Sequence, residues 1–447
     1  ASTAVGNSAV EASIYGIPRG FISGIAPRAH IIAYKALGKQ GGFTSDLAAA
    51  IDQAVADGVD VINYSIGGGA SGPGPDEIAV LFAADAGVFV ATSAGNAGPG
   101  TATLGNPGTM PWLTTVGANT QRRFFKGIAV LGDRSRYSGA SITAGTDKLP
   151  LVDAEFAGGD LCLPGMLDET AVAGNIVLCR RGASARADKS RAVFMAGGAG
   201  MIMYNNSDDD NLSTDSHWVP AVHIDYTPGL AIKHYIATAS EPTAKIKGGM
   251  ARNWPYAPSM TIFSSRGPNP VAPDIIKPDV TAPGTQILAG YSPTPYDEYD
   301  FPGELFAAIQ GTSMSSPIVA GVYALIKQAH PDWSEAMAKS ALMTTAHQDV
   351  VDNDRESAAD PFDMGAGHID PGGRWIKGSI AQPGLAYDAG LFEYAAFTCG
   401  MDWGVFTSGS CDFLESIGVP NEPYNLNYPS IGVGNLAGSQ TVQRTVT

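Results

Sequence analysis

Short apolar runs alternate with helix-like segments through the first 119 residues of the chain. Four such runs predict strands, at residues 29–34, 60–64, 88–91 and 112–117. Apolar residues at helical spacing predict helices over residues 46–56 and 76–86. This alternation is typical of an α/β fold, so we expect a doubly wound parallel sheet. The chain has 447 residues, too many for one compact core, and we expect two or three domains.

A serine follows a glycine turn directly before another predicted helix. The segment GTSMSSP occupies residues 311–317, and the helix is expected over residues 315–328 with Pro317 in its first turn. Its buried face is expected to carry Ile318, Val319, Val322, Leu325 and Ile326. The free N–H groups and the positive dipole end then point towards Ser313, which suits acyl transfer. The alternative is a serine-rich start of an ordinary buried helix.

Two further segments follow predicted strands. Asn96, in ATSAGNAGP (residues 91–99), lies beyond the end of strand 88–91, where open α/β sheets place their ligand sites. Its amide could donate to an oxyanion, or it could simply make a turn next to Gly95. Strand 60–64 opens into Ser65, Ile66 and Gly67, followed by two more glycines. Such bare backbone could pair with a peptide substrate, or it could serve only to change the chain direction.

Together, these three segments resemble motifs of the subtilisin-like serine proteases, the subtilases. The resemblance implies that Ser313 is the nucleophile and that Asn96 and the Ser313 N–H form the oxyanion hole. It also implies a substrate pocket with one wall from residues 65–67 and the other from Ser93, Ala94 and Gly95, with Thr312 also at the substrate site. Neither wall carries a charge, so we expect an apolar or permissive preference.

A subtilase also needs a histidine base and an aspartate that orients it. None of the seven histidines lies in the HGTH motif of the family, and residues 1–7 resemble the helix that follows this motif. The resemblance therefore implies that the catalytic Asp and His lie upstream of residue 1. We expect residues 1–125 to be the first part of the catalytic domain.

The strand–helix alternation is interrupted after the first part of the chain. Residues 145–245 are rich in turns and short strands, with a predicted helix over 189–196 and a strand over 201–204. This segment resembles a mainly-β protease-associated (PA) domain, which implies a role in substrate access or homodimer contact. The acidic run at residues 208–210 favours a solvated loop over a calcium site, because no EF-hand spacing follows.

The catalytic pattern resumes at residues 255–385, where runs around Arg266 and Asp279 resemble the family's lead into the serine motif. We interpret both charged residues as structural. Residues 386–447 resemble a linker and the start of a fibronectin-III-like β-sandwich, with a strand-like stretch over 440–447.

Charge and cysteine content indicate the environment of the protein. The net charge of −16 argues against a nucleic-acid partner, and no apolar run is long enough for a membrane helix. The cysteines form two local pairs, Cys162 with Cys179 and Cys399 with Cys411. The spacing does not suit zinc, and two disulfides are favoured over four free thiols, which indicates a secreted, extracellular protein.

The sequence thus predicts a serine endopeptidase with a Ser-His-Asp triad and no cofactor, structural calcium being possible but not indicated. The expected partners are a protein or peptide substrate and the protein's own pro-segment as an inhibitor. An esterase is disfavoured, because residues 311–315 end in Ser315 where a G-x-S-x-G elbow has glycine. The remaining alternative is an inactive subtilase scaffold that binds peptides or proteins through the PA domain.

Overall fold

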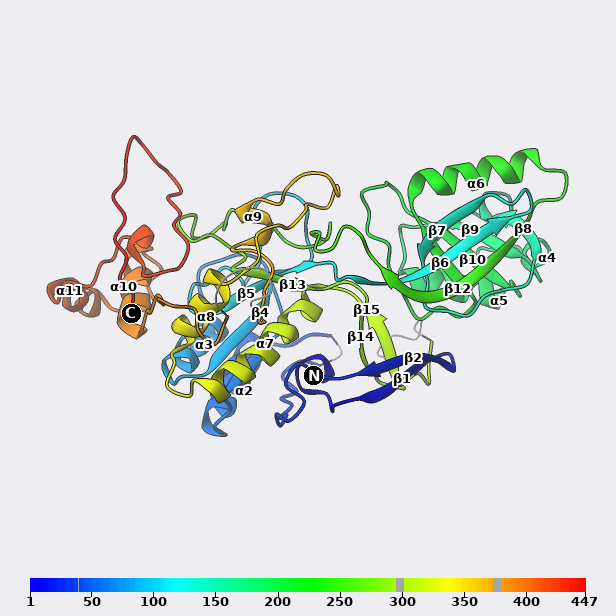
Figure 1. Cartoon of the computed structure of the whole chain (residues 1–447). Coiled ribbons are helices and arrows are strands. Elements are labelled where there is room, and N and C mark those ends of the chain that lie inside the picture. Colours follow the sequence, from blue (N-terminus) through cyan, green and yellow to red (C-terminus); the bar gives the residue numbers. More distant parts are fainter. Residues whose placement is uncertain (39, 295–300, 373–378) are drawn as a thin grey trace.

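A four-stranded parallel sheet lies at the centre of the computed structural model, which describes residues 1–38, 40–294, 301–372 and 379–447 (Figure 1). Its strands, in spatial order, are β13 (Val280–Pro283), β5 (Thr114–Asn119), β4 (Phe89–Ser93) and β3 (Val61–Tyr64). Every residue of β4 and β5 is buried, as expected for parallel strands covered on both faces. The predicted parallel α/β sheet is therefore confirmed.

Five helices contribute to the hydrophobic core of this sheet: α2 (Thr44–Ala56), α3 (Pro75–Asp85), α7 (Thr312–Ala329), α8 (Glu335–Thr344) and α10 (Leu391–Gly400). Helix α7 contacts all four strands. It begins three residues before the predicted position 315. The prediction was also wrong for Leu325, which is 41% exposed rather than part of the buried face.

The predicted strand over residues 29–34 is absent from the structure. Ile31 and Ile32 are 56% and 54% exposed, and these residues pair with no strand. A groove of about 1010 Å³ is lined both by residues 26–34 and by residues 58–64, which include the edge strand β3. A strand needs a hydrogen-bonding neighbour about 4.8 Å away, and the groove leaves residues 29–34 without one.

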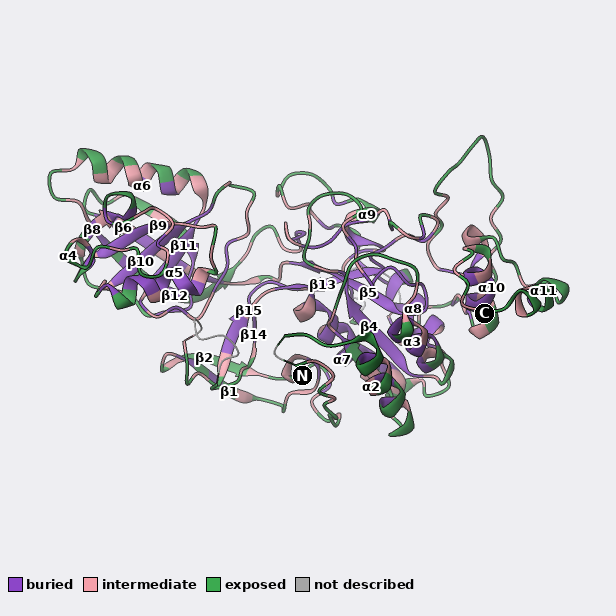
Figure 2. Cartoon of the chain, turned by 180° about the vertical axis from the view of Figure 1, so that it is seen from behind, coloured by how far each residue is buried: buried purple, intermediate pink, exposed green. Residues whose placement is uncertain are grey.

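Residues 123–253 form a closed barrel of seven strands beside the sheet. The strands are β6 (Arg123–Leu131), β7 (Arg136–Ala140), β8 (Leu149–Asp153), β9 (Ile176–Arg180), β10 (Gly200–Tyr204), β11 (Ala221–Ile224) and β12 (Thr243–Asn253). The short η1 (Ala154–Phe156) and helices α4 (Glu169–Val172), α5 (Arg186–Met195) and α6 (Tyr226–Thr238) lie outside the strands. Figure 2 shows the buried barrel interior and the exposed outer face of α6. The barrel includes β6 and β7, which precede the expected insert boundary at residue 145.

Two β-hairpins lie between the barrel and the sheet (Figure 1). One, preceded by the short α1 (Ser2–Val5), pairs β1 (Val10–Ile14) with β2 (Ile17–Ile22). The other pairs β14 (Ile287–Gly290) with β15 (Phe306–Ile309). Barrel residues Phe125 and Ile142 share a small hydrophobic core with residues of both hairpins, among them Ile14, Leu288 and Ala308. The barrel is thus packed against the element that leads into α7.

The last part of the chain is helical and lies opposite the barrel in Figure 1. Its elements are α10 (Leu391–Gly400), α11 (Ser408–Ser416) and η2 (Pro423–Asn425), and the short α9 (Pro361–Met364) precedes them. The strand-like stretch predicted over 440–447 makes only an isolated bridge, between Val446 and Tyr387. Within the described ranges, no helix combines the length and apolar character needed to cross a membrane.

Disulfides join the two cysteine pairs expected from the sequence. Cys162 is bonded to Cys179 of β9, with their Cα atoms 5.7 Å apart. Cys399 of α10 is bonded to Cys411 of α11 at a Cα separation of 5.8 Å. Each disulfide therefore stays within one part of the fold.

Candidate active site

The loops after β3 and β4 meet the beginning of α7 at one edge of the sheet. The two strands are parallel, so their carboxyl ends lie at the same edge. Ser316 Oγ donates to Asn63 Oδ1 of β3 at 2.8 Å, and Thr312 N donates to Asn96 Oδ1 at 2.9 Å. These bonds hold the residues on either side of Ser313 to the end of β3 and to the loop after β4. The structure thus brings together the three segments that were predicted to form the site.

Ser313 lies in the first turn of α7 and is partly exposed. Pro317 follows four residues later and has no N–H to donate to the Ser313 carbonyl. The hydroxyl of Ser65 takes this place and donates to the Ser313 carbonyl oxygen at 3.3 Å. Ser65 therefore supports the backbone of the candidate nucleophile. The sequence did not predict this contact, because it requires a helix that starts at Thr312.

Asn96 is exposed, and hydrogen bonds fix the orientation of its amide. Its Oδ1 accepts from Thr312 N at 2.9 Å and from Thr312 Oγ1 at 3.0 Å. With the oxygen occupied by Thr312, the Nδ2 donor is the atom available to a ligand beside Ser313. This arrangement can stabilise a negative oxygen that forms next to Ser313.

The turn before α7 requires glycine and is anchored to the end of β13. Gly311 has φ 146°, a backbone conformation that side chains disfavour. Its N–H donates to the Gly284 carbonyl at 2.9 Å, and Gly284 N donates to Asn119 O at 2.8 Å. A Cβ on Gly284 would lie 2.4 Å from Ser315 Oγ, so no larger residue fits there. The turn at Gly311, which precedes the candidate nucleophile Ser313, thus depends on the segment after β13.

The expected pocket walls differ in exposure. Ser65 and Ile66 are partly exposed and Gly67 is exposed, whereas Ser93 and Ala94 are only 7% and 1% exposed. Gly95 is partly exposed and adopts φ 104°. On the second side, Gly95 is therefore the most exposed of the three residues.

Asn106 supports the glycine loop and was missed in the sequence. It is 7% exposed, and its carbonyl accepts from Gly68 N at 2.9 Å. Its side chain contacts Ser71 N at 3.3 Å and Ser71 Oγ at 3.2 Å. The local GNP sequence indicates a turn, but it does not say which loop the turn supports.

Two buried carboxylates lie in the first turn of α3, after the glycine loop. Asp76 Oδ2 accepts from the Tyr64 hydroxyl at 2.7 Å, and Glu77 Oε2 accepts from Gly74 N at 2.7 Å. Burial raises the pKa of Glu77, and the charge of Asp76 raises it further. Because Glu77 caps its own helix and Asp76 binds Tyr64, we assign both a structural role.

The histidine contacts described in the structure do not resemble those of a Ser-His-Asp triad. His223 contacts Asn205 and Ser213 in the loop between β10 and β11, and His330 stacks on Trp333. His368 Nδ1 accepts from Asn119 Nδ2 at 2.8 Å. Burial lowers the pKa of His368 to about 4, with the nearby His347 adding to the shift. His368 is therefore held neutral by the sheet and has a structural environment.

Arg266 and Asp279 have the buried, paired environments expected of structural residues. Arg266 is 2% exposed and pairs with Asp352 at 3.0 Å and with Asp363. Asp279 is fully buried and pairs with Lys277 at 2.6 Å.

Comparison with known proteins adds the family. The chain is 44% identical over 426 residues to the subtilisin-like protease SBT1.4 of Arabidopsis thaliana, covering 90% of this chain and 53% of that protein. It is 40% identical over 472 residues to subtilisin-like protease SBT1.7 of the same plant, covering 100% of this chain and 61% of that protein. The chain thus spans less than two thirds of the length of these relatives.

A solved structure, the psychrophilic subtilisin-like protease Apa1 from Pseudoalteromonas sp. AS-11, aligns with a TM-score of 0.38 at 20% identity. The alignment covers 83% of this chain and 80% of that one. Residues 1–367 match the sequence family described as the subtilase family. On this match and the identity to its plant relatives, the chain belongs to the subtilase family.

Proposed function

We propose that the protein is a serine endopeptidase that hydrolyses peptide bonds through an acyl-enzyme. Ser313 Oγ attacks the scissile carbonyl carbon, and its proton passes to an imidazole base. Asn96 Nδ2 and the Ser313 N–H donate to the tetrahedral oxyanion. The observation that carries the proposal is the pair of bonds from Thr312 to Asn96 Oδ1, which leave the Asn96 donor available beside Ser313.

The proposal takes the base and its orienting carboxylate from residues outside this sequence, as the family resemblance implies. The groove of about 1010 Å³ along β3 supports this part of the proposal. β3 is an edge strand whose outer backbone faces residues that form no strand. A further strand in the groove, parallel to β3, would extend the sheet. The carboxyl end of that strand would then lie at the edge that holds Ser313.

Substrate binding is proposed at the loops after β3 and β4. Ser65, Ile66 and Gly67 would form one wall of the pocket, with Ser93, Ala94 and Gly95 as the other and Thr312 beside them. The absence of charge on both walls supports an apolar or permissive preference.

We assign the other domains as the resemblance implies. The barrel is proposed to be a PA domain that controls substrate access or homodimer contact, and residues 386–447 to lead into a fibronectin-III-like domain. The two disulfides support a secreted protein, and a pro-segment is the proposed inhibitor.

Fluorophosphonate labelling of the full-length protein tests the function. We expect the adduct on Ser313, lost on denaturation and in Ser313→Ala. Ser315→Ala, in the same turn, is the matched control and should label at the wild-type rate. A folded protein, freed of any pro-segment, that forms no adduct would instead be an inactive scaffold that binds peptides or proteins.

A further inference from the structure

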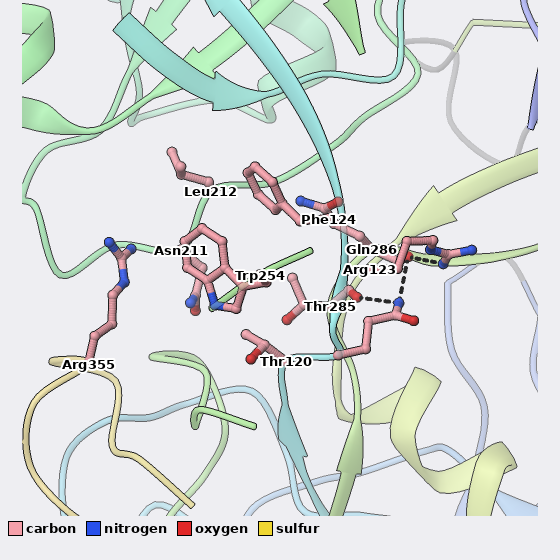
Figure 3. Close-up of a pocket in the computed structure, with 10 residues that line it drawn as sticks. Thr120, Arg123, Phe124, Asn211, Leu212, Trp254, Thr285, Gln286 and Arg355 are labelled. Carbon is pink, nitrogen blue, oxygen red and sulfur yellow. Dashed lines mark hydrogen bonds between the residues drawn. The ribbon is translucent and has the colours of Figure 1, made fainter. Parts of the chain in front are cut away.

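The barrel is hydrogen-bonded to the segment that links β13 to β14. Gln121 Nε2 donates to the carbonyl oxygens of Thr285 at 3.1 Å and Gln286 at 3.0 Å. Arg123 Nη2, at the start of β6, donates to the Gln286 carbonyl at 2.8 Å. Figure 3 shows these residues around a cavity of about 20 Å³ at the junction of barrel and sheet. The residues at the entry to the barrel are thus hydrogen-bonded to the backbone of residues 285 and 286.

The Gln286 side chain adds a bond in the opposite direction. Its Oε1 accepts from the backbone N–H of Phe125 in β6 at 2.8 Å. Gln286 is 1% exposed and has φ 53°, in the left-handed region. Phe125 belongs to the small core that the barrel shares with Leu288 and Ala308. A buried residue in a disfavoured backbone conformation is held there by its surroundings.

Gln286 is also connected by two routes to the turn at Gly311, which precedes Ser313. It lies two residues after Gly284, whose carbonyl accepts from Gly311 N at 2.9 Å. The next residue, Ile287, pairs with Ile309 of β15, which precedes Ser313 by four residues. A second barrel contact reaches the same strand, since Thr214 Oγ1 donates to the Ala308 carbonyl at 3.0 Å. Residue 286 is therefore linked at two points to the segment that directly precedes Ser313.

We propose that Gln286 is a positioning residue, through which the barrel sets the position of Ser313. It touches neither substrate nor the reacting atoms, and its role rests on the proposed function of Ser313. Loss of the bond to Phe125 would let the 284–287 segment shift away from the barrel. A displacement of about 1 Å at a reacting group can cost about 100-fold in rate, so a partial shift should be measurable.

Three variants separate the side-chain bond from general destabilisation. Gln286→Ala removes the acceptor for Phe125 N–H. Gln286→Glu keeps an acceptor oxygen at the same position along the side chain, and the positive charge of Arg123, which donates to the backbone carbonyl of residue 286, favours the carboxylate. The Gln286 Nε2 atom has no partner among the described residues, so the replacement loses no bond there. Gln53→Ala, on the exposed face of α2, is the matched control, because it also removes one glutamine side-chain bond.

The experiment measures kcat and KM on a peptide, the rate of fluorophosphonate labelling, and amide exchange in peptides covering residues 306–314. For Gln286→Ala we expect kcat and labelling to fall about tenfold with KM within about twofold, and exchange in 306–314 to rise. Gln286→Glu should restore both rates to within about twofold of wild type. Gln53→Ala should match wild type throughout.

A Gln286→Ala protein that labels at the wild-type rate, or whose exchange in 306–314 equals that of Gln53→Ala, would overturn the proposal. So would equal losses in the Ala and Glu variants. If Gln286→Ala does not fold, Gln286→Asn replaces it, because asparagine tolerates a positive φ and its shorter side chain falls short of Phe125 N. If wild-type Ser313 never labels, the proposed function fails, and the exchange measurement alone decides whether Gln286 couples the barrel to the turn.

Discussion

At the scale of single residues, the amide of Asn96 can be tested without disturbing its surroundings. Asn96→Asp keeps the oxygen that accepts from Thr312 and removes the Nδ2 donor. We expect kcat to fall about 100- to 1,000-fold with little change in KM, because an oxyanion donor acts mainly in the transition state. This magnitude is taken from a subtilisin, a member of the same family. Steady-state kinetics of the full-length protein on a peptide substrate measures it.

Asn421→Asp, an exposed change of the same kind, controls for the added charge and should leave kcat unchanged. A fall of less than about threefold in Asn96→Asp would remove Asn96 from the oxyanion hole, since losing one such donor costs far more.

A role can be proposed from the sequence for a residue in a motif, but not for a residue that acts through distant contacts. Ser313 and Asn96 lie in short segments whose residue order carries the information. Ser65 donates to the carbonyl oxygen of Ser313, and the carbonyl of Asn106 accepts from Gly68 N. In both contacts the two partners are far apart in the sequence. Neither contact has a local signal, because both depend on how the sheet arranges its loops.

At the scale of elements, two adjacent serines in the first turn of α7 should have opposite effects on stability. Ser315 Oγ is buried and has no hydrogen-bond partner among the described residues, whereas Ser316 Oγ donates to Asn63 of β3. A buried hydroxyl without a partner is costly, so Ser315→Ala should raise the free energy of unfolding by up to about 1 kcal/mol. Ser316→Ala should lower it by about 1 kcal/mol.

Thermal melting of the two variants beside wild type measures this difference, and each variant is the control for the other. A lower melting temperature for Ser315→Ala than for Ser316→Ala would contradict the assignment of the two hydroxyls.

Elements with long, regular patterns were predicted well. The predicted helix over 46–56 corresponds to α2, and the run at 88–91 corresponds to β4. The strand expected over 29–34 failed because its apolar pattern needs a neighbouring strand, which a pattern alone cannot supply. Helix α7 begins earlier than predicted because Gly311 is its N-cap residue, so that residues 312–314 already belong to the helix. The closure of the barrel depends on β6 pairing with β12, more than a hundred residues later, and no local pattern indicates it.

At the scale of the whole molecule, a buried charge network joins the last segment of the chain to the sheet. Lys277 and Asp279 are both fully buried, and Asp279 Oδ2 also accepts from Thr115 N of β5 at 2.7 Å. Burial lowers the pKa of Lys277 to about 8, although Asp279 opposes this shift. The Tyr428 hydroxyl donates to Asp279 Oδ1. Residue 428 therefore satisfies a charge in the core of the sheet.

Tyr428→Phe should destabilise the sheet together with the C-terminal segment. It leaves one oxygen of a buried carboxylate without its donor, which costs about 1.5–3 kcal/mol. We expect a lower melting temperature and faster proteolysis of the whole sheet region. Tyr424→Phe changes a partly exposed tyrosine nearby and should melt as wild type. Release of residues 386–447 alone, with the sheet still protected, would show that the segment is an independent unit.

Buried histidines should make the barrel sensitive to mild acid, as the partly buried His368 should make the sheet. His217 lies in the loop between β10 and β11, His223 lies in β11, and they are 5% and 1% exposed. Burial lowers the pKa of His217 to about 4 and that of His223 well below its usual range. Although burial opposes ionisation of Asp215, the Arg186 guanidinium lowers its pKa, so this pair stays charged throughout mild acid. In mild acid these two histidines therefore stay neutral in the folded barrel and become protonated when it unfolds. Their protonation stabilises the unfolded state.

A histidine whose folded pKa is lowered stabilises the fold above its unfolded pKa of about 6.5, and this stability is lost as the pH falls towards the folded pKa. For His217 the loss should be about 2 kcal/mol between pH 7 and pH 5. Melting curves at both pH values should show a fall in wild type that is smaller in His217→Gln, since that variant has lost one titrating group. His234→Gln, on the exposed face of α6, should fall as far as wild type. Equal falls in wild type and His217→Gln would mean that His217 does not contribute to the acid sensitivity.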